Sequence, residues 1–588
     1  MQSLWRALML LMALLCLIGG PARAADGDIA PGQRFVSVAF HDVVDSPALL
    51  DGDAVTTDRL VAFFDFLRGD GWTAITLDDV DAARRGTRAL PPKAILITFD
   101  DGYASLYTRV FPLLLAYRMP IVAALKGAWV EAAPGTMVRY GDKRVPRENF
   151  IRWEQAREMA RSGLVEFASH SQRMHHGAVG NPQGNLMPAA VTRLYADGAY
   201  EDDAGHRRRL REDLQHSYDL LAREIGQAPR AVVWPFGRYS QDAIDAAKVV
   251  GFRFALSLDP EPANAATPMA LARYLPTFDP KLSEIERNLR FTPTLPSAQR
   301  LVCVDPASVW AGNADATDDR LGHLIERLRV LGSTAVVIDA AVHDPQGKLV
   351  AAWFPTRELP LRADLLSRLA WQIQTRAGVE VFVRLPVAAA QRSLGGDAQR
   401  VRALFRELGV QVPASGLWLD DAPGLAALAA APGEGGAMPW QVQRIRQQLD
   451  ENRLAADDAL ALQAFREVER ARPRLRLALL APADAPMTPS AVADLTLFPA
   501  GANRAASLQA VETFATTRAP GLNPTRRIGL WLTSAAPADV QALSVAMHRL
   551  QVAGGTVLGW CPDDAVADAP EALRLAPATS AATFPIKF

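Results

Sequence analysis

The stretch "AILITFDDGYAS", residues 94–105, decides the fold of the first half of the chain. Its first six residues are apolar or β-branched and predict a buried strand, which ends in a turn formed by Asp100, Asp101 and Gly102. Two adjacent carboxylates repel each other, so we expect a positive charge beside them. An isolated Asp-Asp-Gly is usually only a turn. In a parallel sheet covered by helices, however, ligands bind where the strands end, so this aspartate pair is a candidate site.

Segments that predict strands alternate with helical patterns on both sides of this stretch. Residues 56–69 predict a helix, because four large apolar residues recur at the spacing of one helix face and Thr57 can cap its start. Four prolines interrupt residues 276–299, and the same alternation resumes at residue 300. The pattern predicts an α/β protein with two (β/α) barrel-type domains. We expect them at residues 25–280 and 300–588, with a linker at 281–299.

The length of 588 residues also favours two domains, and the net charge of −1 gives no bulk basic field that would favour nucleic acid as a partner. The first 24 residues predict a cleaved signal peptide: Arg6 precedes an apolar run that is too short to cross a bilayer, and Ala22-Arg23-Ala24 is a cleavage site. We therefore expect an exported protein and not a transmembrane one. Cys16 leaves a lipoprotein as the alternative, but two leucines precede it where a lipidation site has small residues.

Several histidines follow other predicted strands. Of the nine histidines in the chain, His41, His170, His175 and His176 all fall just after such strands. Because the carboxyl ends of parallel strands meet at one edge of a sheet, these side chains converge with the aspartate pair. Two imidazoles and one carboxylate form a site for a divalent metal, and the spare carboxylate can accept a proton from water. The cation would neutralise one aspartate and leave the other ionised.

Five motifs carry a resemblance to a known family. Residues 98–102 (TFDDG) and 170–175 (HSQRMH) resemble the first two motifs of the carbohydrate esterase family 4 polysaccharide deacetylases. "FHDVVD" (40–45), "GNPQGN" (180–185) and "WPFG" (234–237) narrow the resemblance to the exported members that deacetylate poly-β-1,6-N-acetyl-D-glucosamine in biofilm export systems. The resemblance covers almost the whole mature chain and implies that the first domain is a distorted polysaccharide-deacetylase barrel.

The resemblance also implies a role for each of these residues. Asp100 would be the general base that activates a water on the metal, and His41 the general acid that protonates the leaving amine. Asp101, His170 and His175 would hold one divalent ion, for which zinc, nickel, cobalt and iron all suit the donors. The reaction would be hydrolysis of an acetamide to acetate and a free glucosamine.

Further implications concern the oxyanion, the location and the partners. The backbone near Phe236, with Trp234 beside it, would help to bind the oxyanion or the substrate, whereas His176 is expected to be a bystander. The resemblance implies a periplasmic protein, associated with the outer membrane through an export protein, that acts on an exopolysaccharide. Two alternatives stay open: a deacetylase of chitin-type polymers or peptidoglycan, and a non-catalytic glycan-binding scaffold of the export system.

The second half of the chain resembles the glycoside-hydrolase-type barrel of the same proteins, most clearly at residues 353–382. Asp420 and Asp421, at the end of a predicted strand, match its acidic motif, and one of them would be a general acid. Leu419 stands where the family usually has histidine, and Arg384 where it usually has an aromatic residue. Sugar binding relies on aromatic faces, so the loss of aromatic residues weakens the case for binding as well. A glycosidase also needs a partner for its acid, and the sequence offers none, so glycan binding or a scaffolding role is favoured over cleavage.

Two cysteines remain in the expected mature chain, Cys303 and Cys561. They lie in the first strand and near the last strand of the second domain, which are neighbours if the barrel closes. Export would permit a disulfide, and two buried thiols are the alternative.

Overall fold

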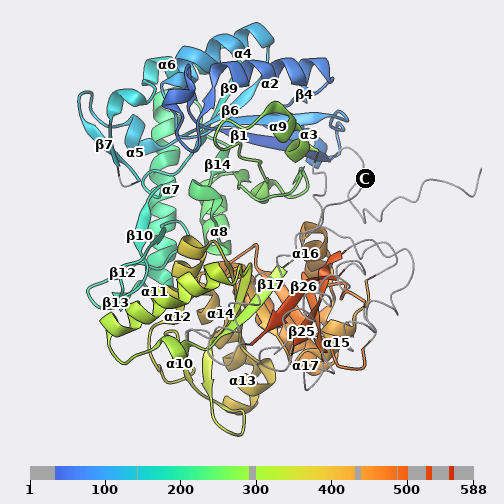
Figure 1. The fold of residues 1–588 in the computed structure, drawn as a ribbon. Coiled ribbons are helices and arrows are strands. Elements are labelled where there is room, and N and C mark those ends of the chain that lie inside the picture. Colours follow the sequence, from blue (N-terminus) through green and yellow to red (C-terminus); the bar gives the residue numbers. More distant parts are fainter. Residues whose placement is uncertain are drawn as a thin grey trace, which may run out of the picture.

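The computed structural model describes residues 33–141, 143–290, 299–430, 439–485, 488–500, 525–532 and 555–561. It contains two α/β domains, drawn at the top and the bottom of Figure 1, and confirms the predicted fold class. The predicted signal peptide lies outside the described residues. Within the part of the chain that the structure describes, no helix is long and apolar enough to cross a membrane.

The first domain is built on one curled sheet with the strand order β15-β14-β9-β6-β5-β1-β16, and β4 lies beside β5. All neighbours are parallel except β16, which runs antiparallel to β1. The strands are β1 (Arg34–Phe40), β4 (Thr73–Ala74), β5 (Ala94–Phe99), β6 (Ile121–Leu125), β9 (Val165–Ser169), β14 (Ala231–Val233), β15 (Phe254–Leu256) and β16 (Ala263–Asn264).

A short segment closes the gap between the two sides of this sheet. Leu271 forms an isolated bridge with Leu256 of β15, and Tyr274 forms one with Val38 of β1. The Tyr274 amide donates to Ser37 at 2.8 Å, and its carbonyl accepts from the Ala39 amide at 2.8 Å. Because residues 271–274 join the first and last parallel strands, the sheet curls into a distorted barrel.

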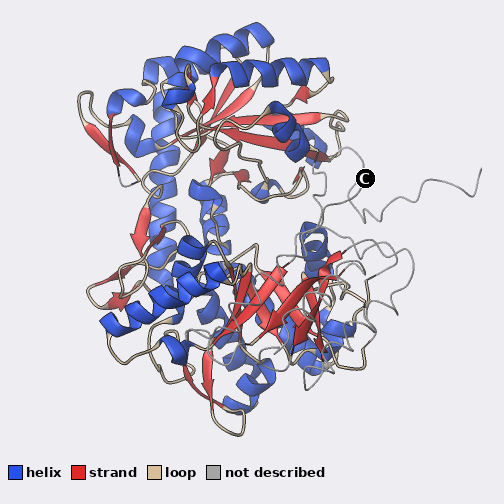
Figure 2. Cartoon of the chain, in the orientation of Figure 1, coloured by secondary structure: helices blue, strands red, loops and turns tan. Residues whose placement is uncertain are grey.

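Helices cover the outside of the sheet (Figure 2). They are α2 (Thr57–Gly69), α3 (Leu77–Arg84), α4 (Phe111–Tyr117), α5 (Gly127–Val130), α6 (Trp153–Arg161), α7 (Asp203–Ile225), α8 (Gln241–Val250) and α9 (Leu282–Leu289). Helix α2 is the helix predicted at residues 56–69, and its four large apolar residues are buried. Its N-cap is Thr56, whose hydroxyl accepts from the Arg59 amide, and not Thr57, which is the first helical residue.

The predicted linker at residues 281–299 begins too early. Residues 282–289 form helix α9, whose Ile285 and Leu289 are fully buried in the core beneath α2. Proline spacing suggested a linker, but the two apolar side chains stand four residues apart on one helix face and bury there. The first domain therefore extends at least to Leu289.

The second domain is a closed barrel of eight parallel strands in sequence order. They are β17 (Gln299–Val304), β18 (Ala335–Asp339), β21 (Glu380–Arg384), β22 (Gly416–Leu419), β23 (Arg476–Leu480), β24 (Leu495–Ala500), β25 (Thr525–Leu532) and β26 (Gly555–Trp560). The described helices around it are α10 (Pro306–Val309), α11 (Ala314–Val330), α12 (Leu366–Gln372), α13 (Val387–Ser393), α14 (Ala398–Gln411), α15 (Pro423–Ala427), α16 (Pro439–Gln448) and α17 (Ala456–Ala471).

The first and last strands of this barrel are joined covalently as well as by hydrogen bonds. β17 pairs with β26, and Cys303 forms a disulfide with Cys561, with Cα atoms 4.7 Å apart. The disulfide that the sequence left open is therefore present. It links residues 258 positions apart and fixes the seam at which the barrel closes.

Short hairpins and strands extend from both domains. They are β2 (Val43–Val44), β3 (Val55–Thr56), β7 (Met137–Tyr140), β8 (Lys143–Pro146), β10 (Gly177–Val179), β11 (Leu186–Pro188), β12 (Tyr195–Ala196), β13 (Ala199–Tyr200), β19 (Ala341–His343) and β20 (Leu349–Ala352). The region of β10 to β13 reaches the second domain: the Tyr200 hydroxyl donates to Asp364 at 2.6 Å, and the Gln183 amide donates to the Asp364 carbonyl at 2.7 Å.

Candidate active site

The first aspartate of the opening motif is held by a buried arginine. Arg273 donates from its two terminal nitrogens to the two carboxylate oxygens of Asp100, at 2.8 and 2.9 Å, and also donates to the Thr98 hydroxyl. Arg273 lies on the segment that closes the sheet, and both charged side chains are almost fully buried. The positive charge expected beside the aspartate pair is therefore a side chain of the protein, and not only a bound cation.

The electrostatics of Asp100 follow from this contact. Burial alone would raise the pKa of its carboxyl group, but the charge of Arg273, helped by His170 and His41, outweighs burial and lowers that pKa to about 2. Asp100 is thus a carboxylate over the whole range in which the protein would work, and it can accept a proton.

The second aspartate is presented by a strained turn. Asp101 adopts a left-handed φ of 73°, which costs a residue with a side chain on the order of 1–3 kcal/mol. Gly102 follows with a φ of 79°, and a Cβ there would lie 2.7 Å from Leu125. The backbone therefore requires the glycine of this motif, and the two carboxylates contact different partners, Arg273 for Asp100 and the histidines for Asp101.

Asp101, His170 and His175 meet at one point. The Oδ1 atom of Asp101 lies 3.4 Å from Nε2 of His170 and 3.6 Å from Nε2 of His175. Nδ1 of His170 is bonded to the Val233 carbonyl at 2.8 Å, which requires the proton on Nδ1 and leaves the lone pair on Nε2. Burial lowers the pKa of His170 to about 4 and that of His175 to about 3, so both rings are neutral.

These three residues fit a divalent cation. Asp101 Oδ1 and His170 Nε2 are buried and have no hydrogen-bond partner among the described residues. Burial raises the pKa of Asp101, which means that its ionised form lacks sufficient positive charge nearby. One ligand atom from each of the three residues lies within 4.8 Å of the others. A cation among them would satisfy the orphaned atoms and balance the carboxylate, and an Asp/His/His donor set suits zinc, nickel, cobalt or iron.

His41 lies on the other side of Asp100. It follows β1, the neighbour of β5, and its Nε2 atom lies 3.9 Å from Oδ2 of Asp100. Its own Nδ1 is buried without a hydrogen-bond partner among the described residues. The next residue, Asp42, accepts from the Ser105 hydroxyl at 2.6 Å and from the Val43 amide at 2.9 Å, which fixes the turn that carries His41.

Aromatic side chains surround the three convergent residues. The ring of His175 lies 4.5 Å from that of Phe236, 5.2 Å from Trp129 and 6.4 Å from Tyr140. Tyr140, on β7, also donates to Oδ2 of Asp101 at 3.3 Å. Phe236 has a left-handed φ of 58° and is 45% exposed, so the strained turn after β14 projects it into solvent beside the site.

Trp234 and His176 lie differently from their neighbours. Trp234 is 1% exposed and stacks on Tyr239 in a core cluster, away from solvent. His176 follows His175, but its Nδ1 bonds to the Arg173 carbonyl at 2.7 Å, and it does not join the metal-ligand cluster. Of the residues singled out in the first domain, the structure thus brings together Asp100, Asp101, His41, His170, His175 and Phe236.

The acidic pair of the second domain occupies the end of β22, as expected, but an arginine stands beside it. Arg384 donates two hydrogen bonds to Asp339, at 2.5 and 2.9 Å, and lies 3.8 Å from Asp420. Asp421 accepts from the Ala388 amide at 2.6 Å. Burial raises the pKa of both Asp420 and Asp421. Arg384, noted as a departure from the family pattern, therefore places one positive charge among these acids.

Sequence reasoning missed Arg273, Tyr140 and Trp129. Arg273 lies within "MALARYLP" (269–276), an arginine enclosed by apolar residues shortly before the predicted domain boundary. An arginine in such a context buries only if a carboxylate pairs with it, which was the available signal. Tyr140 and Trp129 come from a hairpin and a short helix whose positions depend on the tertiary fold.

Comparisons with known proteins agree with this geometry. Residues 87–255 match the polysaccharide deacetylase family, and residues 303–415 match a family described as hypothetical glycosyl hydrolase family 13. A poly-β-1,6-N-acetyl-D-glucosamine N-deacetylase of Escherichia coli K12 is 37% identical over 360 residues, which are 61% of this chain and 53% of that protein. The chain thus spans about half the length of the curated relatives it matches.

Two solved structures are also similar to part of the chain. A de-N-acetylase from Aggregatibacter actinomycetemcomitans is 33% identical, with 43% of this chain and 99% of that chain covered and a TM-score of 0.42. The deacetylase domain of a Bordetella bronchiseptica protein is 39% identical, with 42% and 97% covered and a TM-score of 0.38. Residues 87–255 of this chain thus match the polysaccharide deacetylase family, and the chain is similar in sequence to poly-β-1,6-N-acetyl-D-glucosamine N-deacetylases.

Proposed function

We propose that this protein is a metal-dependent hydrolase that removes N-acetyl groups from poly-β-1,6-N-acetyl-D-glucosamine. The observation that carries the proposal is that the two adjacent aspartates have different surroundings. Asp100 is neutralised by Arg273, while Asp101 faces His170 and His175 with its Oδ1 atom unpartnered. Asp100 can therefore act as a base, and Asp101 is available to bind a cation.

Each residue then has a task that its surroundings support. Asp101, His170 and His175 would hold the metal, which when bound polarises the acetamide carbonyl and lowers the pKa of water. Asp100 accepts the proton of the attacking water, because Arg273 keeps it ionised and fixes its orientation. His41, 3.9 Å from Asp100, donates a proton to the leaving nitrogen. The Phe236 backbone amide is our candidate donor to the oxyanion.

The substrate and the location are part of the proposal. The curated relatives named as poly-β-1,6-N-acetyl-D-glucosamine N-deacetylases support this polymer over chitin-type polymers or peptidoglycan. The predicted signal peptide supports a periplasmic protein, and we propose that it acts on the exopolysaccharide during export, beside an outer-membrane export protein, in biofilm formation. The second domain would bind the partly deacetylated polymer.

The test is acetate release from a β-1,6-linked N-acetylglucosamine pentamer by the purified mature protein. We expect release that a chelator abolishes and that zinc, nickel, cobalt or iron restores, with little release from the β-1,4-linked pentamer. Asp100→Asn is expected to keep the metal and lose activity, whereas His176→Ala, the matched control, keeps both. Release that is insensitive to the chelator would contradict the metal, and equal release from both pentamers would contradict the substrate. Absence of release with every metal would leave the glycan-binding scaffold as the better account.

A further inference from the structure

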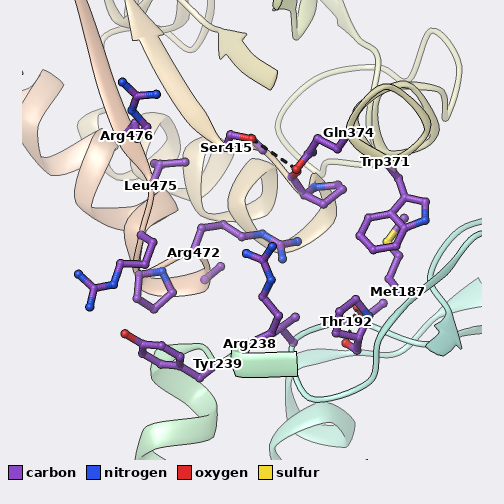
Figure 3. A pocket seen from close by; sticks show the side chains of 18 of the residues that line it. Met187, Thr192, Arg238, Tyr239, Trp371, Gln374, Ser415, Arg472, Leu475 and Arg476 are labelled. Carbon is purple, nitrogen blue, oxygen red and sulfur yellow. Dashed lines mark hydrogen bonds between the residues drawn. The ribbon is translucent and has the colours of Figure 1, made fainter. Parts of the chain in front are cut away.

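A cavity of about 300 Å³ lies between the two domains, and none of Asp101, His170 and His175 lines it; Figure 3 shows side chains that do. The first domain contributes the loops that follow β11, β14 and β15, including Arg238 and Tyr239. The second domain contributes the amino-terminal ends of β21, β22 and β23, together with Trp371 of α12 and Arg472. The cavity therefore lies at the end of the second barrel opposite to Asp420 and Asp421.

Four arginines and two acids line this cavity, and the acids are already paired. Asp259 lies 2.8 Å from the guanidinium of Arg474, which also pairs with Glu261. Glu380 lies 2.5 Å from the guanidinium of Arg476. Each of these two acids thus balances the charge of one arginine, and the Asp259–Arg474 pair joins the two domains across the cavity.

The other two arginines, Arg238 and Arg472, lack such partners. Within the described ranges, neither guanidinium has a carboxylate within 4.0 Å. Arg472 uses its Nε to donate to the Gly409 carbonyl at 3.1 Å, which anchors the side chain, and its two terminal nitrogens have no hydrogen bond to any described residue. Arg238 is exposed to the cavity and comes from the opposite domain.

The two side chains point toward each other across the domain interface (Figure 3). Burial, followed by the charges of Arg238 and Arg193, lowers the pKa of Arg472 to about 10. Two like charges that face each other in a partly enclosed space destabilise one another unless an anion lies between them. Paired guanidinium groups bind phosphate or carboxylate with several charge-assisted hydrogen bonds.

An apolar wall stands beside this arginine pair. Trp371 lies next to Met187 in Figure 3 and faces the same cavity. A cavity of this volume exceeds the needs of a bare ion and falls at the lower end of the range for small-molecule sites. We propose that the cavity binds an oxyanion, phosphate or carboxylate, carried on a body of monosaccharide size, with Arg238 and Arg472 on the anion and Trp371 against the body.

The test is calorimetric titration of the mature protein with four probes: inorganic phosphate, glucose 6-phosphate, glucuronate and uncharged glucose. We expect one or both sugar anions to bind, and to bind more tightly than inorganic phosphate, whereas glucose does not. The comparison of glucose 6-phosphate with glucuronate distinguishes a phosphate from a carboxylate as the anion.

Variants assign the binding to the arginine pair. Arg238→Gln and Arg472→Gln should each weaken binding of the preferred anion about tenfold, the loss of about one charge-assisted contact. Arg207→Gln, an exposed arginine on α7, removes the same charge outside the cavity and should have no effect. Thermal denaturation checks that each variant is folded. Because Arg238 is exposed, its substitution is expected to disturb the fold less than that of Arg472. The proposal is overturned if no anion binds, if glucose binds as well as the anions, or if Arg238→Gln binds them as wild type does.

Discussion

The Asp100–Arg273 pair gives the sharpest test of the site, through the variant Arg273→Gln. Both side chains are nearly inaccessible to solvent, and two hydrogen bonds of 2.8 and 2.9 Å join them. Removing one partner of such a pair leaves a buried charge uncompensated, at a cost of about 3–5 kcal/mol. We therefore expect the variant to lose stability on that scale and to lose acetate release.

The pH dependence of this loss has a definite sign. The pKa of Asp100 in the folded protein is about 2, below its ordinary value of about 3.9, so the pair stabilises the fold above that ordinary value. In Arg273→Gln, burial is no longer opposed by the arginine and raises the pKa of Asp100. The difference between wild type and variant should thus be largest at neutral pH and shrink as the pH falls toward 2.

The loss of stability is measured by hydrogen exchange of the peptides that cover β5 and β1, which carry or adjoin the pair. The metal content of the variant is measured at the same time. Because Arg273 contacts none of Asp101, His170 and His175 among the described contacts, the variant should keep its metal. The double variant Asp100→Asn/Arg273→Met removes both charges and should regain most of the stability but no activity. A loss below about 1 kcal/mol, which is usual for exposed pairs, would refute the inference that this pair is buried and tight.

Three further predictions concern the metal ligands, the turn after β14 and the disulfide. His170→Ala should lose both metal and acetate release, while His176→Ala keeps both, as measured by metal analysis of the purified proteins; retained metal in His170→Ala would contradict its role as a ligand. Gly237→Ala should destabilise the first domain by about 1–3 kcal/mol in thermal denaturation, because its φ is 65° and a Cβ would lie 2.6 Å from a neighbouring leucine side chain. Cys303→Ser/Cys561→Ser should lower the stability of the second domain in urea by about 2–5 kcal/mol, and an unchanged midpoint would show that the disulfide does not constrain the barrel.

The strand ends were predictable from the sequence because a parallel sheet fixes where they meet. Once residues 94–99 were identified as a buried strand, the topology placed Asp100, Asp101, His41 and His170 at one edge, and the structure brings them together. Closure of the second barrel was also predictable, and it placed Cys303 and Cys561 on neighbouring strands, although the sequence left open whether they are bonded. These features follow from alternation and strand order, which local sequence carries.

Arg273 was not predictable in the same way. It is 173 residues from Asp100 and lies on a segment that pairs with β1 and β15 only through isolated bridges. Such a segment has no strand pattern, and its prolines and polar neighbours suggested a boundary. Helix α9 was missed for a related reason, since its two buried residues are too few to stand out among charged ones.

The mouth of the second barrel shows how one substitution changes what a carboxylate can do. A glycosidase needs one carboxyl group that is protonated at the working pH and a second group on the other side of the bond. Burial raises the pKa of Asp420, as a protonated acid requires, but the charge of Arg384 acts to lower it. Arg384 also donates two hydrogen bonds to Asp339. Asp421 has one oxygen bonded to the Ala388 amide. Because Arg384 pairs with Asp339 and lies 3.8 Å from Asp420, the acids at this mouth face a positive charge, and we propose that this domain binds the glycan without cleaving it.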